Sequence, residues 1–465
     1  MHFQSIGFLF LFLPVLLLGL RLTPAGWPRR LTLVAFSYLF YSASEPLFVL
    51  VLLASSITDY IVALRLSVCS QQIRRRLWLC TSILINLSLL AFFKYGGFIL
   101  TELPVLGVLL ALPFAPEDFY LTFLLPAGIS FYTFQSLSYS IDVYRGEVQP
   151  TRNLVGFFNY VSYLPQLVAG PIERYRKLGP QLDLFCSGRS KPDYRNGLNR
   201  LSLGLVQKLL VADACGRVVD GLVGPGQSFD LVTGWLFALA FGLQIYYDFA
   251  AYVNMALGIA LMMGIHLSEN FLSPYKAVNI QDFWRRWHIT LSQWLRDYLY
   301  FPLGGSRLGH VRTLVNILIT FLLCGLWHGA GYNYLLWGVL HGLMLCLYRV
   351  YRLLPVSVTL PVPIGWFLTF CLVMFAWVPF RITDLDVVIT IWQGMVGLNG
   401  VNLSDAPMFD SLMVGVVMYL TLRLPNCAER MPGSSSQAES ALLWLLAIAA
   451  LYVSPQVDQF IYFQF

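Results

Sequence analysis

The chain has 465 residues, of which 57% are hydrophobic and only 12% are charged. A soluble globular protein carries about twice that share of charged residues, so the composition excludes an ordinary soluble domain and indicates a membrane protein. The net charge of +6 is ordinary for membrane-protein loops and gives no reason to expect nucleic acid as a partner.

Long apolar runs recur along the whole chain and predict an all-α polytopic membrane protein. They include FLFLFLPVLLLGL near the start and LLWLLAIAALYV near the end. At roughly 20 residues per span plus loops, we expect about 11 or 12 transmembrane helices. No long hydrophilic segment separates two halves, and we find no repeat of fixed period. We therefore predict a single membrane domain over residues 1–465.

The distribution of arginine predicts the orientation of the chain in the membrane. The first apolar segment lacks a basic leader and a small-residue cleavage site, so we expect it to remain as the first span. Three Arg follow it, at positions 21, 29 and 30, and four more lie between 65 and 76. The positive-inside rule places these two loops in the cytoplasm and the N-terminus outside.

Eight cysteines are scattered along the chain without a CxxC pair, so we predict neither a disulfide framework nor a metal site. The largest polar stretch, residues 173–200, has seven basic and three acidic residues. It fits a cytoplasmic loop that follows the positive-inside rule. It also fits a docking surface for an anionic donor, and the sequence leaves both readings open.

The apolar segment around residue 248 carries Gln244, Tyr247 and Asp248 on one helical face. An ionisable residue at membrane depth is costly, so Asp248 should face the protein interior or a wet cavity. The pattern does not distinguish a residue that lines a cavity from one that holds helices together.

The nineteen residues from Gln281 to Leu299 contain three Arg, two Asp, three Trp and His288. A helical wheel places Trp284, Trp287, Leu291, Trp294, Leu295 and Tyr298 on one face and the charges on the other. Asp282 and Arg286 are four residues apart, which favours an ion pair. We predict one amphipathic helix lying in the membrane interface, with Trp at headgroup depth, ended by Pro302 and Gly304–Gly305.

Two histidines follow in apolar surroundings, His328 and His341, with no carboxylate within seven residues of either. A neutral imidazole can accept a proton, so either one suits a general base. A histidine in this setting can also hydrogen-bond neighbouring helices together. Gly329, Gly331 and Asn333 predict a helix break just after His328. In such a hairpin the two histidines would lie at different depths, so we do not expect one hydrogen-bonded dyad. Cys324, one turn before His328, could form an acyl-enzyme but more simply reads as a small packing residue.

Five segments in this order resemble the membrane-bound O-acyltransferase (MBOAT) superfamily, in particular its bacterial branch that acetylates polysaccharides such as alginate. The similarity is densest from 121 to 345. The segments are LPAGISFYTFQSLSYSIDVYRGE (125–147), LPQLVAGPIERY (164–175), YYDFAAYVNMALG (246–258), QDFWRRWHITLSQWLRDYLYFPLGG (281–305) and LWHGAGYNYLLWGVLHG (326–342). The terminal FIYFQF is also similar to that branch.

The resemblance implies transmembrane helices and horizontal interfacial helices around a funnel through a bacterial inner membrane. It implies catalytic roles for His328 and His341, and it places Arg285, Arg286 and His288 beside the tunnel. Trp327 or Asn333 would stabilise the oxyanion, and Asp248 would line the tunnel.

The implied reaction uses acetyl-CoA as the donor, with no bound cofactor or metal. The acceptor would be an exported polysaccharide, reached directly or through a periplasmic partner protein, with membrane lipid as the surroundings.

Other readings of the same chain are a transporter or flippase with Asp248, Asp59 and Lys94 on its path, and an acyltransferase of peptidoglycan, teichoic acid or lipid.

Overall fold

The structure is a computed structural model. It describes residues 2–43, 45–102, 125–224, 228–354, 360–402, 407–429, 436–454 and 460–461. These residues form helices joined by loops, and no strand occurs among them. The all-α prediction is therefore confirmed over the described part of the chain.

Seven of the described helices are long and apolar enough to cross a membrane. Their bounds are Phe48–Val68, Gln72–Ile99, Leu231–Met262, His310–His328, Tyr332–Tyr351, Val362–Arg381 and Met408–Glu429. Three shorter apolar helices lie at Phe8–Leu22, Leu385–Met395 and Gln437–Val453. The expected 11 or 12 spans refer to the whole chain and stay a prediction, because the seven are counted among the described residues only and residues 103–124 lie outside them.

The chain divides into two compact units, which we describe separately. The first unit comprises Met1–Leu201 and Val253–Ser268, and the second comprises Ser202–Tyr252 and Glu269–Phe465. Helices α10 and α12 each contribute residues to both units, so the expectation of one membrane domain stays a prediction.

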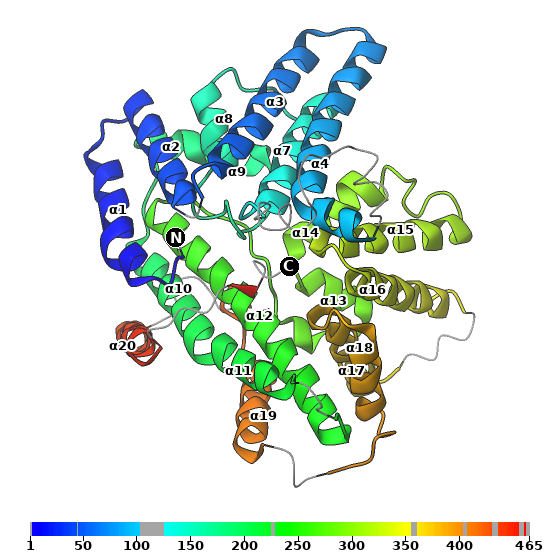
Figure 1. Cartoon of the computed structure of the whole chain (residues 1–465). Coiled ribbons are helices and arrows are strands. Elements are labelled where there is room, and N and C mark those ends of the chain that lie inside the picture. Colours follow the sequence, from blue (N-terminus) through cyan, green and yellow to red (C-terminus); the bar gives the residue numbers. More distant parts are fainter. Residues whose placement is uncertain are drawn as a thin grey trace. The chain divides into compact units, whose positions relative to one another are not determined.

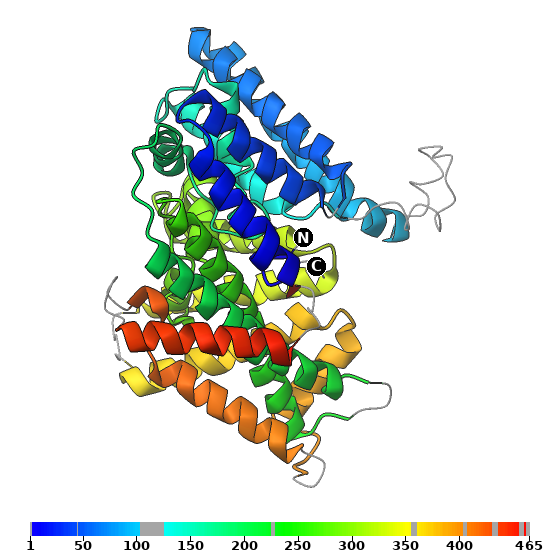
Figure 2. The same ribbon diagram turned by 90° about the vertical axis from the view of Figure 1, so that its left-hand side faces the viewer.

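The helices of the first unit come mainly from the N-terminal part of the chain (Figure 1). They are η1 (Phe8–Phe12), α1 (Leu13–Leu22), α2 (Trp27–Ser42), α3 (Phe48–Val68), α4 (Gln72–Glu102), α7 (Ile129–Arg145), α8 (Leu154–Val161), α9 (Tyr175–Cys186) and α10 (Tyr194–Val206). Figures 1 and 2 show α3 and α4, drawn in blue, as a long pair side by side, and α7 packs against both.

A buried polar network joins α3, α4 and α7. The Asp59 carboxylate accepts hydrogen bonds from the Asn86 amide at 3.0 Å, the Ser140 hydroxyl at 2.9 Å and the Ser82 hydroxyl. The Ser55 hydroxyl in turn donates to the Asn86 side-chain oxygen at 2.6 Å. Buried polar groups are stable when they are satisfied in this way, so Asp59 holds three helices together.

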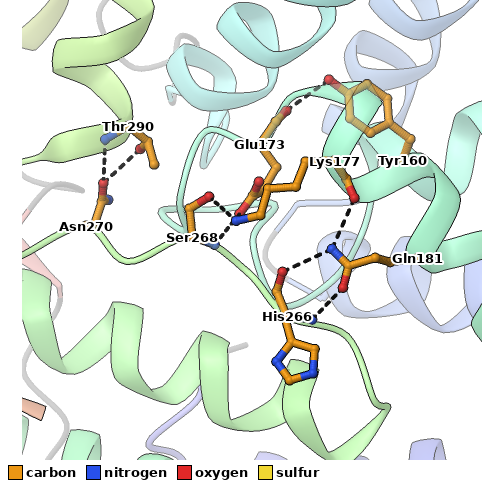
Figure 3. Close-up of polar contacts among 8 residues, drawn as sticks. All are labelled: Tyr160, Glu173, Lys177, Gln181, His266, Ser268, Asn270 and Thr290. Carbon is orange, nitrogen blue, oxygen red and sulfur yellow. Dashed lines mark hydrogen bonds and ion pairs between the residues drawn. The ribbon is translucent and has the colours of Figure 1, made fainter. Parts of the chain in front are cut away.

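The segment that follows α12 is fastened to α9 within the first unit (Figure 3). The Gln181 amide pairs with both backbone groups of His266, at 2.8 and 3.1 Å. The buried Glu173 carboxylate accepts the Ser268 backbone N–H, and Lys177 donates to the Ser268 hydroxyl at 2.5 Å. Burial raises the pKa of the Glu173 carboxyl, and Lys177 opposes that shift.

The helices of the second unit follow in chain order. They are η2 (Gln207–Ala212), α11 (Asp213–Leu222), α12 (Leu231–Met262), η3 (Pro274–Lys276), α13 (Ile280–Arg286), α14 (Ile289–Leu295), η4 (Arg296–Tyr300), α15 (His310–His328), α16 (Tyr332–Tyr351), α17 (Val362–Arg381), α18 (Leu385–Met395), α19 (Met408–Arg423), η5 (Cys427–Glu429) and α20 (Gln437–Val453).

Two glycines let α15 and α16 pack closely as neighbours in Figure 1. A Cβ added to Gly325 would lie 2.3 Å from the Tyr334 carbonyl oxygen, and one added to Gly338 would lie 2.4 Å from that of Phe321. No side chain fits at such distances, so the two backbones are in direct contact and the register of the pair is fixed.

Helix α17 contains an internal proline, Pro379, which has no N–H to give to the Phe375 carbonyl. The indole N–H of Trp392 on α18 donates to that carbonyl instead, at 3.0 Å. At the same turn, the Asn333 amide of α16 donates to the Pro379 carbonyl at 3.0 Å. Helix α17 is therefore tied to α16 on one side and to α18 on the other.

Candidate active site

The predicted amphipathic helix of residues 281–299 is broken in the middle. Helix α13 ends at Arg286, α14 begins at Ile289, and His288 between them has a left-handed backbone with φ +41°. The prediction of one continuous helix is therefore wrong. Residues other than glycine rarely adopt this conformation, so the surrounding structure must hold His288 in place.

The fully buried side chain of Asn270 holds that turn (Figure 3). Its oxygen accepts the Thr290 backbone N–H at 3.1 Å and the Thr290 hydroxyl at 2.8 Å, while its own backbone oxygen accepts the Ile289 N–H at 3.0 Å. These bonds satisfy the first donors of α14, which the left-handed His288 leaves without a capping side chain.

The imidazole of His288 is completely buried and packs edge-on against Phe249, with ring centroids 4.8 Å apart. Burial lowers the pKa of His288 from 6.5 to about 3. The ring is therefore neutral at physiological pH.

The tryptophans of this stretch lie inside the protein. Trp284, Trp287 and Trp294 are 7%, 1% and 8% exposed. Their position at the depth of lipid headgroups stays a prediction, since burial inside the protein does not fix a residue's depth in the membrane. The helical wheel did group them correctly on one apolar face, but protein covers that face. The predicted ion pair between Asp282 and Arg286 is confirmed at 3.0 Å.

His328 is the last residue of α15, and the helix break predicted after it is confirmed. Three aromatic side chains meet its imidazole edge-on. The ring centroids of Trp327 and Trp337 lie 4.9 Å from it, and that of Phe380 lies 5.1 Å from it. The imidazole thus lies among rings from α15, α16 and α17.

His341 also contacts Trp337, with ring centroids 4.7 Å apart. It is completely buried, and neither ring nitrogen has a hydrogen-bond partner among the residues that the structure describes. The expectation that the two histidines form no hydrogen-bonded dyad is confirmed, because neither nitrogen of His341 is bonded to His328.

The three histidines and two tryptophans form one continuous row in the second unit. Its order is His288, Trp327, His328, Trp337 and His341, and the first contact has ring centroids 6.1 Å apart. The sequence predicted the three histidines and Trp327 as site residues, and the structure brings them together.

The other predicted residues lie elsewhere or are already engaged. Arg285 is exposed, while Arg286 is bound to Asp282 and to the Leu272 carbonyl. The Asn333 amide is bound to Pro379. We find no group of three or more His, Cys, Asp or Glu suited to a metal ion in the described part of the chain.

Asp248 belongs to a buried charge cluster. Its carboxylate lies 3.0 Å from the Lys208 ammonium, which is also 2.8 Å from Asp213. The backbone N–H of Ile461 donates to Asp248 at 2.7 Å. These contacts favour the reading of Asp248 as a residue that holds helices together, and they also tie the Phe460–Ile461 segment to α12.

Trp337 and Phe380 touch His328 but did not emerge from the sequence. Trp337 lies nine residues away and Phe380 lies on another helix, and a single aromatic in an apolar run carries no distinguishing pattern. The three rings together surround an imidazole that can accept a proton from a substrate hydroxyl.

The chain belongs to the membrane-bound O-acyltransferase family, MBOAT, whose model matches residues 149–380. It is therefore an O-acyltransferase. Its relatives modify polymers of the cell envelope, so the chain is an acyltransferase that acts on an envelope polymer.

Individual relatives match over most of the chain. The probable alginate O-acetylase AlgI of Azotobacter vinelandii is 40% identical over 87% of this chain and 80% of its own length. The peptidoglycan O-acetyltransferase of Helicobacter pylori is 35% identical over 91% of this chain and 87% of its own. The teichoic acid D-alanyltransferase of Bacillus subtilis is 25% identical over 52% of this chain and 62% of its own.

Proposed function

We propose that this protein moves an acetyl group from acetyl-CoA, on the cytoplasmic side, to an exported polysaccharide on the other side of a bacterial inner membrane. The observation that supports it most is His328, set at a helix end among three aromatic rings inside the region that matches the family. The acetylases of alginate and peptidoglycan among its relatives support acetyl as the group transferred.

In the proposed reaction His328 acts as general base. It takes the proton from the acceptor hydroxyl while that oxygen attacks the thioester carbonyl carbon. The tetrahedral intermediate collapses by breaking the C–S bond, and the leaving thiolate takes the proton from His328. The histidine is restored, and one ester and one thiol are formed.

The negative oxygen of that intermediate needs a hydrogen-bond donor. The Trp327 indole is the better candidate of the two that the sequence suggested, because it contacts His328 directly at 4.9 Å between ring centroids. Asn333 already gives one amide hydrogen to Pro379, which fits a structural role.

The negative phosphates of acetyl-CoA would be attracted by Arg285 and by the basic residues of the 173–200 stretch. Arg285 and several of those residues, including Arg189 and Lys191, are exposed. We further propose that a periplasmic partner protein completes the transfer when the polymer itself does not reach His328.

The test compares the acetyl content of secreted and envelope polysaccharide in wild-type cells, a deletion strain, and cells that express His328→Ala at matched membrane levels. We expect deletion and His328→Ala to lose polymer acetylation while polymer export continues. His266→Ala is the matched control, because that histidine is exposed and belongs to the other unit. Normal acetylation in the His328→Ala strain would refute the proposed role of this residue.

The acetylated polymer identifies the acceptor. Loss of acetyl from an alginate-like polymer supports the proposal as stated, and loss from peptidoglycan moves the acceptor to that polymer. A matched assay with purified protein, using acetyl-CoA labelled in the acetyl group, tests the donor. Label that appears only with an acyl-carrier protein would refute acetyl-CoA.

A further inference from the structure

The aromatic rings around His328 leave little room beside its imidazole. Trp327, Trp337 and Phe380 meet the imidazole plane at 77°, 82° and 74°. Trp337 and Phe380 are completely buried and contact each other with ring centroids 5.2 Å apart. Two flat side chains therefore form a continuous wall on one flank of the histidine.

A second row of rings backs this wall. Behind Trp337 lie His341 at 4.7 Å, Trp284 at 5.8 Å and Trp377 at 6.1 Å between ring centroids. Trp377 also contacts Phe380 at 5.4 Å. All of these side chains are buried, so other aromatic rings rather than solvent back the wall.

The backbone that carries the wall is also fixed. Gly338, next to Trp337, lies against α15 so closely that an added Cβ would collide with the Phe321 carbonyl. Pro379, next to Phe380, is held by the Asn333 amide at 3.0 Å. The backbone positions from which both rings extend toward His328 are therefore held by these contacts.

We propose that Trp337 and Phe380 set the size of the acyl group, admitting acetyl and excluding chains of four or more carbons. The inference rests on the proposed function, in which the thioester carbonyl reacts at His328. Each additional methylene would have to enter a close-packed aromatic wall, and interiors of this density tolerate extra volume poorly. The bonds made and broken are the same for every acyl group, so only the fit changes.

The experiment is a competition between donors. Purified protein in lipid nanodiscs receives equal amounts of acetyl-CoA and butyryl-CoA, and the two esters formed on the polysaccharide are counted by mass spectrometry. Their ratio equals the ratio of the two kcat/KM values and does not depend on the fraction of protein that is folded. This independence matters because Trp337 is a core residue.

We expect wild-type protein to form acetyl esters almost exclusively. In Trp337→Leu the ratio of butyryl to acetyl esters should rise by about tenfold or more, as is typical when one or two methylenes gain space in an apolar pocket. Phe380→Leu should change the ratio in the same direction. Trp27→Leu is the control, because Trp27 is 55% exposed on α2 of the first unit, and its variant should keep the wild-type ratio.

An unchanged ratio in both variants would overturn the proposal, and so would a wild-type protein that transfers butyryl as readily as acetyl. Loss of all transfer in both variants would also overturn it, because the rings would then serve structure or catalysis rather than size selection. Failure of the proposed function is a different result, in which His328→Ala transfers acetyl normally from the same donors.

Discussion

Lys208 is a nearly fully buried cation between two carboxylates, Asp213 at 2.8 Å and Asp248 at 3.0 Å. We predict that Lys208→Met destabilises the protein by about 3–5 kcal/mol, because two buried negative charges then lose their common partner. Asp248→Asn should cost less, since it leaves one complete ion pair. Thermal unfolding in detergent measures both.

The matched control for Lys208 is the pair of Asp220 and Arg381, in which the Asp220 side chain is 64% exposed. Asp220→Asn should change stability by less than about 1 kcal/mol. If Asp220→Asn lost as much stability as Lys208→Met, burial would not be the reason for the cost of breaking the Lys208 ion pairs.

His288 gives the protein a defined response to acid. Its pKa is about 3 in the folded protein and 6.5 in an unfolded chain, so between these values unfolding takes up a proton. Stability contributed by neutral His288 is complete above pH 6.5. It is lost as the pH falls toward 3, by at most about 1.4 kcal/mol per pH unit.

His288→Asn removes this titration, and asparagine tolerates the left-handed backbone better than most residues. We predict that the variant loses less stability than wild type between pH 6.5 and 4.5, as measured by unfolding temperature. His266→Asn, at an exposed histidine, should keep the wild-type slope. If the unfolding temperatures of wild type and His288→Asn changed equally with pH, the prediction would be refuted.

At the residue scale, the sequence identified those side chains whose chemistry is rare in an apolar chain. His288, His328 and His341 stood out for that reason, and the structure places them in one row. Trp337 and Phe380 did not stand out, since aromatics are common in membrane helices. Only three-dimensional packing shows that they contact His328.

At the element scale, the hydrophobic periodicity predicted which residues share one face of a helix better than it predicted where a helix is interrupted. The apolar residues that the wheel grouped on one face of 281–299 are buried in the protein, but the helix stops at Arg286 and restarts at Ile289. The cause is Asn270, eighteen residues before His288, whose side chain caps the restart. A contact of that kind has no local signal. The break after His328, by contrast, was predicted from the nearby Gly329, Gly331 and Asn333.

The pair of α15 and α16 gives a prediction about packing. Gly338→Ala places a methyl group 2.4 Å from the Phe321 carbonyl oxygen, so the helices must separate. We expect a loss of about 1–3 kcal/mol in stability and a matching loss of acyl transfer. Gly415→Ala on α19 is the control, because a Cβ there meets nothing within 4 Å. It should be neutral or stabilising by up to about 1 kcal/mol, as alanine favours helices.

At the scale of the whole molecule, the charge pattern predicts how the donor is attracted. Arg189 and Lys191 lie in the exposed, basic loop between α9 and α10. The double variant Arg189→Glu, Lys191→Glu should raise KM for acetyl-CoA by about tenfold at low salt and by less at high salt. N,S-diacetylcysteamine, a thioester without phosphates, should show no such change. An equal rise for both donors would indicate damage to the fold.

The membrane character of the molecule was predictable from composition alone, because burial in lipid requires apolar helices. The number of spans stays a prediction, because the described part of the chain contains three shorter apolar helices beside the seven long ones, and length alone does not decide whether these cross the membrane. The orientation with the N-terminus outside stays a prediction, which cysteine labelling from each side of the membrane would check.

Four of the twelve tryptophans, Trp284, Trp287, Trp337 and Trp377, form a single group beside His328 and His341. Indole rings separated by 4.9 to 6.1 Å between centroids couple their electronic transitions. The protein should therefore have a strong circular dichroism signal in the aromatic bands that arises mainly from the site. That signal would report, without substrate or label, whether a purified preparation has kept the surroundings of its histidines intact.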